Sequence, residues 1–89
     1  MSGITHPDTA RVLRDIAGER ERQVNKNWTR DHDDHHDTDT LVRLSASYAR
    51  RQGKGKAPGY FDRERLVQAA ALLVAAVEAM DRREARDVE

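Results

Sequence analysis

The segment from Asp31 to Asp39, hereafter the acidic segment, concentrates the side chains of this chain that could bind a ligand. It holds five aspartates and three histidines, with no basic residue among them. Imidazole and carboxylate are ligands of zinc and manganese, and carboxylates also bind magnesium. In a helical segment, histidines four residues apart would share a face. The candidate site for such a divalent metal ion comprises His32, Asp33, His35 and His36.

Two interpretations of the acidic segment need no metal. In a polar loop, aspartate carboxylates commonly cap neighbouring helices and turns. Alternatively, the carboxylates form an anionic patch that binds a basic partner through electrostatic complementarity. The candidate residues for that contact are Trp28, Asp31, Asp33, Asp34, Asp37 and Asp39.

A second candidate region is the basic stretch from Arg50 to Lys56. Glycines and lysines alternate there, which places flexible backbone beside cationic side chains, as binding of a phosphate requires. The spacing differs from that of a P-loop, and no serine or threonine follows the lysines. The weak candidates for contact with phosphate or nucleic acid are Arg50, Arg51, Lys54 and Lys56. An exposed connection between helices is the simpler interpretation.

A third candidate is the pair of carboxylates at Glu78 and Asp81, one helical turn apart. This spacing suits two ligands of one magnesium ion, although charges beside Arg82 and Arg83 usually belong to a solvated surface. The chain offers no convincing arrangement for nucleophilic catalysis, so we name no catalytic residue.

The composition limits the class of protein that could carry these segments. The chain has 89 residues, 36% of them charged, a net charge of zero and no cysteine. This length fits one domain, and the lack of thiols excludes disulfides and thiolate metal sites. No export signal and no apolar run long enough to span a bilayer is recognisable. We therefore expect a cytoplasmic protein without a membrane partner.

Three helices are expected to position the candidate regions within a single domain, residues 1–89. The first spans about Pro7 to Asn25, with a sparse apolar stripe. The second follows an N-cap at Thr38 or Asp39 and ends at Gly53, and the third follows Asp62. The stripe of the first helix comprises Val12, Leu13, Ile16 and Val24. The stripe of the second comprises Leu41, Leu44, Ser45 and Tyr48. The remaining segments are a tail at 1–6, loops at 26–38 and 53–61, and a frayed end at 83–89.

The third helix predicts both the fold class and an oligomer. Its main apolar stripe comprises Leu66, Ala69, Ala70, Leu73, Val77 and Met80, and further apolar residues cover nearly its whole circumference. Such a helix is buried on most sides, yet a chain with three helices can hardly surround it. We therefore predict an all-α three-helix bundle that dimerises through this helix. The aromatic residues Tyr60 and Phe61 are expected to fold back onto the core.

The order of several motifs resembles a family of short proteins that are common in phage and prophage genomes. The motifs cover most of the chain from Glu19 to Arg82. The resemblance implies a phage accessory protein acting in the host cytoplasm, and it implies no particular activity. The motifs are Glu19-Arg20-Glu21-Arg22-Gln23, then Trp28 with His32-Asp33-Asp34 and His36, then Leu41, Tyr48-Ala49, Pro58, residues 66–73 and Glu78-Ala79-Met80-Asp81-Arg82.

A looser resemblance is to the all-α nucleoside triphosphate pyrophosphohydrolases, which hold magnesium with carboxylates on neighbouring helices. Their pattern is Glu-Glu-x-x-Glu on one helix and Glu-x-x-Asp on the next. Glu78 and Asp81 match the second half of this pattern. The second predicted helix contains no glutamate, so the first half is missing, and this favours a protein without catalytic activity.

These patterns favour a small accessory protein that acts by protein–protein contact. Carboxylates presented where nucleic-acid phosphates would lie can block a host defence complex such as a CRISPR effector. The expected partners are therefore a host protein or nucleoprotein complex and a second copy of the chain. The alternatives are a metal-dependent nucleotide hydrolase that uses the acidic segment with Glu78 and Asp81, and a small nucleic-acid-binding module that uses the basic stretch.

Overall fold

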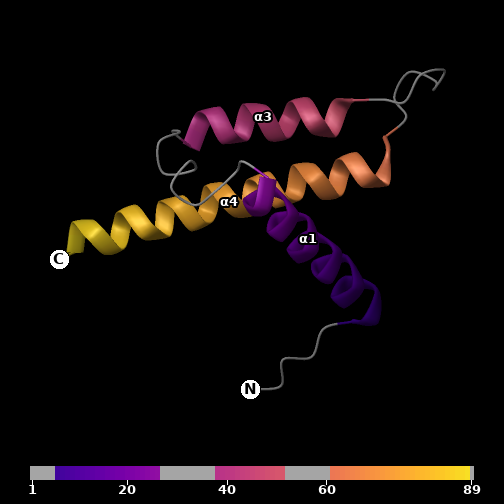
Figure 1. The fold of residues 1–89 in the computed structure, drawn as a ribbon, viewed down its shortest axis with the longest axis horizontal. Helices are drawn as coiled ribbons and strands as arrows, with labels where there is room; N and C mark the ends of the chain where they lie inside the picture. The colour runs from indigo at the N-terminus through magenta and orange to yellow at the C-terminus, as the bar shows by residue number, and fades with distance from the viewer. Residues whose placement is uncertain (1–5, 27–37, 52–60, 89) are drawn as a thin grey trace.

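The structure is a computed structural model that describes residues 6–26, 38–51 and 61–88. These residues form three helices, α1 (Pro7–Lys26), α3 (Thr38–Arg50) and α4 (Arg63–Val88), and no strand (Figure 1). The predicted all-α three-helix bundle is thus confirmed. Within the described ranges, no helix has the length and hydrophobicity needed to cross a membrane.

The helices begin where local signals in the sequence place them. Pro7 opens α1, and the ring nitrogen Nδ1 of His6 accepts a hydrogen bond from the backbone N–H of Asp8 at 3.1 Å. This bond satisfies one of the free N–H groups of the first turn. At the start of α4, the backbone N–H of Leu66 donates to the carbonyl of Asp62 at 3.0 Å. The predicted helix starts at Pro7 and after Asp62 therefore agree with the structure.

Helix α4 is the centre of the bundle. Helix α3 runs antiparallel along one side of it, and α1 crosses it on another side (Figure 1). Leu41 of α3 and Leu72 of α4 are the largest fully buried side chains. Their neighbours on α4 are small, and small side chains let helix axes approach closely. These buried alanines are Ala69, Ala71, Ala75, Ala76 and Ala79.

The stripe predicted for the second helix is confirmed on α3. Leu41 and Ser45 are buried, and Leu44 and Tyr48 are half-buried. The hydroxyl of Ser45 donates to the carbonyl of Val42 at 2.7 Å, so its polar atom is satisfied inside the same helix.

The stripe predicted for α4 is largely exposed in the single chain. Leu66, Leu73, Val77 and Met80 are between 43% and 56% exposed, and of the predicted stripe only Ala69 is buried. The side covered by α3 and α1 is instead the alanine-rich side around Leu72. Because α4 is apolar around most of its circumference, hydrophobicity alone does not identify the side that the other helices cover.

The stripe predicted for α1 is also only partly correct. Ile16 and Val24 are half-buried, whereas Val12 is 39% and Leu13 is 54% exposed. The most buried residues of α1 are Arg20 and Gln23, which are 5% and 6% exposed. Helix α1 therefore meets α4 with a mixed polar and apolar face.

Two further expectations for the chain ends and the core differ from the structure. Phe61 is 53% exposed and does not plug the core, and Tyr60 lies outside the described residues. Helix α4 continues to Val88, through most of the predicted frayed end. Arg83 accounts for part of this continuation, because its Nη1 donates to the hydroxyl of Thr38 on α3 at 3.2 Å.

Candidate functional site

Most of the predicted site residues cannot be placed by the structure. The described residues include Asp39, Arg50 and Arg51 but not residues 31–37 of the acidic segment or the lysines of the basic stretch. Among the described residues, no group of three or more histidine, aspartate or glutamate side chains could hold a metal ion. The predicted positions outside the described residues are Trp28, Asp31, His32, Asp33, Asp34, His35, His36, Asp37, Lys54 and Lys56.

Asp39 lies in the first turn of α3 and is exposed. Its carboxylate lies 2.8 Å from Nε of Arg43, one turn further along the helix, and both side chains are more than half exposed. A carboxylate at this end of a helix is favoured by the helix dipole. The structure therefore gives Asp39 a local role in α3, which is compatible with the predicted contact to a partner.

Arg50 and Arg51 lie at the end of α3, and both are exposed. The guanidinium of Arg51 stacks over the ring of Tyr48 at 4.5 Å from its centroid, and its backbone N–H donates to the Tyr48 carbonyl at 3.2 Å. Cations are favoured at the C-terminal end of a helix by the helix dipole. This local role needs no phosphate ligand.

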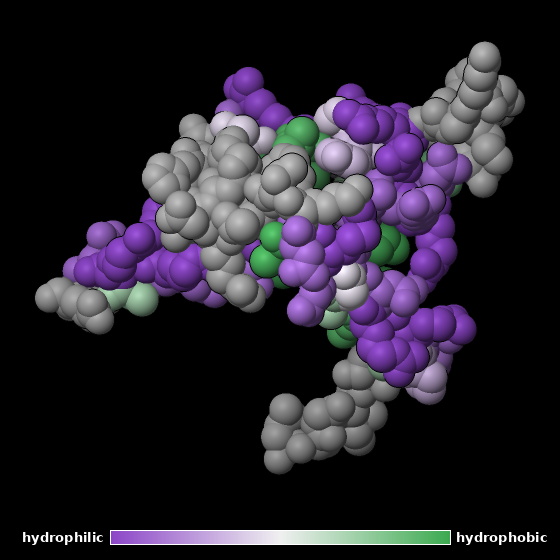
Figure 2. Space-filling model, in the orientation of Figure 1, coloured by the Kyte–Doolittle hydropathy of each residue, from purple (hydrophilic) through white to green (hydrophobic). Residues whose placement is uncertain are grey.

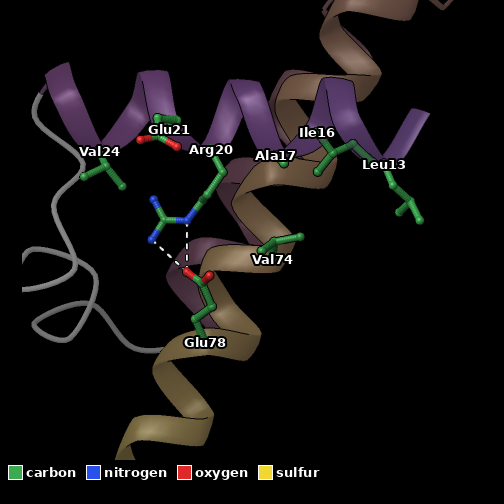
Figure 3. A pocket seen from close by; sticks show the side chains of 8 residues that line it. All are labelled: Leu13, Ile16, Ala17, Arg20, Glu21, Val24, Val74 and Glu78. Atoms are coloured by element: carbon green, nitrogen blue, oxygen red, sulfur yellow. Dashed lines mark hydrogen bonds and ion pairs between the residues drawn. The ribbon is translucent and has the colours of Figure 1, made fainter. Parts of the chain in front are cut away.

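Glu78 is engaged with α1 through an ion pair. Its Oε1 lies 3.1 Å from Nε and 3.0 Å from Nη2 of Arg20 (Figure 3). The Arg20 side chain is 7% exposed, and that of Glu78 is 34% exposed. A magnesium ion would have to displace a buried arginine from this carboxylate. This geometry weighs against the magnesium site considered from the sequence.

This ion pair is part of the wall of a groove between α1 and α4 with a volume of about 350 Å³. Figure 3 shows the ion pair below α1, with the carboxylate of Glu21 and apolar side chains along the remainder of the groove wall. The groove could accommodate an apolar side chain beside a charged group. Its lining residues are Leu13, Ile16, Ala17, Arg20, Glu21, Val24, Val74 and Glu78.

Gln23 extends the polar part of the contact between α1 and α4. Its Nε2 donates to the backbone carbonyl of Gln68 at 3.4 Å and to Oε2 of Glu19 at 3.3 Å. Its Oε1 is buried without a hydrogen-bond partner among the described residues. Ile16, Arg20 and Gln23 recur at intervals of four and three residues and therefore share a face of α1. Because Arg20 and Gln23 are polar, no apolar periodicity marks this face in the sequence.

Glu19 connects this buried region to the surface of α1. Its carboxylate lies 2.6 Å from Nη2 and accepts a 2.9 Å hydrogen bond from Nε of Arg22. This hydrogen bond and the charge of Glu19 raise the pKa of Arg22 above its ordinary value. Because a raised pKa stabilises the fold at every pH below the ordinary arginine value, this contribution does not change across the neutral range.

A smaller hollow of about 210 Å³ lies on the other flank of α1. Arg63, one of the residues that line it, holds Asp15 of α1 through an Nη2–Oδ2 contact of 2.7 Å. Two of the residues that line the hollow, Leu66 and Ala70, belong to the apolar stripe predicted for α4. The apolar residues of its wall are Val12, Ile16, Leu66, Val67 and Ala70.

Comparison with known proteins identifies no relative of this chain. No protein-family model, curated protein or solved structure matches this chain. The resemblances to the phage family and to the pyrophosphohydrolases stay predictions. A function for this chain must therefore be inferred from its own side chains.

One side of α4 carries apolar side chains that neither α1 nor α3 covers. It presents Leu66, Leu73, Val77 and Met80, although α1 and α3 cover other sides of the same helix. Figure 2 shows a surface that is mostly hydrophilic, with several separate hydrophobic patches towards the middle of the view. A row of large half-exposed apolar side chains on a charged protein is typical of a contact surface.

Proposed function

We propose that this protein acts by protein–protein contact and that α4 joins two copies of the chain. The observation that carries this proposal is the row formed by Leu66, Leu73, Val77 and Met80, each at least 43% exposed. Apolar surface of this kind gains free energy when a second protein removes it from water. The small, alanine-rich core supports the proposal, because a chain of this size gains stability from association.

The experiment that tests this proposal measures the mass of the protein in solution by sedimentation over a range of concentrations. The wild-type protein should reach the mass of two chains, and Leu73→Glu should sediment as a monomer because it places a charge within the apolar row. Val42→Glu on α3 is the matched control, since Val42 and Leu73 are both 43% exposed. A wild-type protein that is monomeric at every concentration would refute the self-association.

The proposal also includes a basic partner for the acidic segment, such as a host defence complex that binds nucleic acid. Support comes from the concentration of carboxylates between Asp31 and Asp39. Along the sequence, this acidic segment is separate from the basic stretch at residues 50–56. Carboxylates can occupy a cationic groove that otherwise binds phosphates. The resemblance of the motifs to those of phage proteins is the basis for proposing an accessory role.

Charge reversal tests the acidic segment separately from the dimer. Changing Asp31, Asp33, Asp34 and Asp37 to lysine should abolish inhibition of target-DNA binding by a purified CRISPR effector complex. Asp8→Lys, in the exposed first turn of α1, serves as a control for the general effect of charge. Equal inhibition by the wild-type and the lysine variant would eliminate the acidic segment as the contact surface.

A further inference from the structure

The exposed apolar side of α4 has the spacing of a coiled-coil seam. Leu66, Ala70, Leu73, Val77 and Met80 follow one another at intervals of four, three, four and three residues. In heptad terms Ala70 and Val77 occupy a positions, and the other three occupy d positions. Four of the five are at least 43% exposed, and Ala70 is half-buried. A seam of this spacing fits another helix that lies nearly parallel to α4.

We infer that a second copy of this chain covers this seam with its α4 running antiparallel, so that Ala70 lies opposite Met80 and Leu73 opposite Val77. This inference rests on the proposed function, because it assigns a direction and a register to the self-association proposed there. Antiparallel pairing about a two-fold axis places each a position opposite a d position of the second copy. The same register places Leu66 opposite Glu84 and Arg63 opposite Asp87 at the two ends of the seam.

Charge distinguishes the antiparallel arrangement from the parallel one. Heptad a positions at the two ends of the seam hold Arg63 and Glu84, and the next d position holds Asp87. A parallel dimer would set each of these charges against its identical residue. The antiparallel register instead places Asp87 of the second copy opposite Arg63, whose guanidinium also contacts Asp15 of α1 at 2.7 Å. It also opposes the two helix dipoles, which is the favourable orientation for neighbouring helices.

Side-chain size favours the same register. A parallel dimer would place Ala70 against Ala70, which leaves a gap, and Met80 against Met80. In the antiparallel register the small Ala70 faces the long, adaptable Met80, and Leu73 faces Val77, so each layer has a similar volume. Matched layers fill the space between two helices without a cavity.

The area of the seam is consistent with a reversible dimer. From their exposed fractions, the four large side chains of both copies together offer about 700 Å² of apolar surface, below the size of a standard stable interface. The dimer should therefore form and dissociate with concentration, which makes its direction accessible to cross-linking at equilibrium.

Cysteine cross-linking tests the direction, because the chain contains no cysteine of its own. The variants are Ala70→Cys and Met80→Cys, oxidised separately and as a mixture. In the antiparallel register, two copies of the same variant place their cysteines about 15 Å apart along the helix, too far for a disulfide. The mixture brings the two positions into opposition. We expect a cross-linked heterodimer from the mixture and none from either variant alone.

The outcomes separate this inference from the proposed function. Cross-linking of each variant by itself would establish a parallel dimer, which overturns the register and retains the self-association. Sedimentation of the wild-type and both variants as monomers would overturn both. Ser47→Cys, on the exposed part of α3, mixed with Ala70→Cys gives the background of random collisions.

A charge variant gives an independent measurement that needs no disulfide. In the Asp87→Lys variant, the introduced ammonium would face Arg63 of the second copy in the antiparallel register. Because like charges repel, the dissociation constant of the dimer should rise about tenfold. In a parallel dimer the same change merely replaces one pair of like charges with another. An unchanged dissociation constant in a dimeric, helical Asp87→Lys protein would therefore contradict the antiparallel register.

Discussion

At the scale of single residues, the ion pair between Arg20 and Glu78 determines how α1 meets α4. The Arg20 side chain is 7% exposed, so its guanidinium has lost most of its contact with water. Desolvation of this kind is tolerable only with an opposite charge in good geometry, and the two contacts of 3.0 and 3.1 Å supply it. The pair therefore specifies the position of α1 more than it adds to net stability.

Removal of the negative partner should reveal the cost of burying Arg20. We expect Glu78→Gln to lower the free energy of unfolding by about 1–2 kcal/mol, because an amide compensates the guanidinium less well than a carboxylate does. The value lies below that for a fully buried pair, since Glu78 is 34% exposed. Urea unfolding monitored by circular dichroism measures the change.

Arg43→Gln is the control for this prediction. It breaks the ion pair with Asp39, in which both side chains are more than half exposed. Exposed pairs of this kind contribute at most about 0.5 kcal/mol. Equal losses in Glu78→Gln and Arg43→Gln would show that the burial of Arg20 carries no special cost.

At the scale of elements, α1 contains one position that lowers its own helical stability. Gly18 lies in the middle of α1, and a Cβ atom built there would meet nothing within 4 Å. Glycine inside a helix costs about 0.5–1 kcal/mol relative to alanine, because the unfolded chain has more conformations to lose. The open space around this position means that alanine can be accommodated without a shift.

Gly18→Ala should therefore raise the free energy of unfolding by about 0.5–1 kcal/mol. Thermal and urea unfolding would both record the gain. Unchanged or lower stability would indicate that the backbone of α1 bends at Gly18 or that another group occupies the open space.

The contact between α3 and α4 depends on one pair of large side chains. Leu41 and Leu72 are the largest fully buried residues, and small alanines surround them on α4. Because alanine side chains cannot expand into a cavity, loss of either leucine leaves a void that the neighbouring residues fill poorly.

We expect Leu41→Ala to lower the free energy of unfolding by about 2–4 kcal/mol. The adjacent Val42→Ala should change it by less than about 0.5 kcal/mol, because Val42 is 43% exposed. Both values come from the same urea titration. Similar losses at the two positions would mean that α3 does not pack on α4 through the face containing Leu41.

At the scale of the whole molecule, the chain folds around a helix that it covers incompletely. Two sides of α4 contact α1 and α3, and the third carries the apolar seam that we propose to be covered by a second copy. A folded state that associates is stabilised by mass action, whereas the unfolded chain is not.

The thermal midpoint should consequently rise by a few degrees as the protein concentration is raised from micromolar to millimolar. Leu73→Glu should abolish this dependence, and Val42→Glu should retain it. Circular dichroism at several concentrations, with path lengths adjusted, provides the measurement. A wild-type midpoint that is independent of concentration would be incompatible with coupled folding and association.

Local chemistry allowed the sequence to determine where the helices lie. Pro7 and Asp62 mark helix starts through their own backbone and capping preferences, and the spacing of Leu41, Leu44, Ser45 and Tyr48 identifies the buried face of α3. These signals act between residues a few positions apart, so no tertiary contact is needed to interpret them. The acidic segment is also recognisable in the sequence, but most of its residues lie outside the described part of the chain, so its predicted role stays a prediction.

Only the tertiary structure decided which faces of α1 and α4 pack within the chain. Arg20 is buried because Glu78, 58 residues further along, supplies the opposite charge, and no local pattern encodes that pairing. On α4 several faces are apolar, so hydrophobicity could not determine that the alanine-rich side faces α3 while Leu73 and Val77 stay exposed. The choice depends on close packing, because small residues allow helix axes to approach and large ones hold them apart.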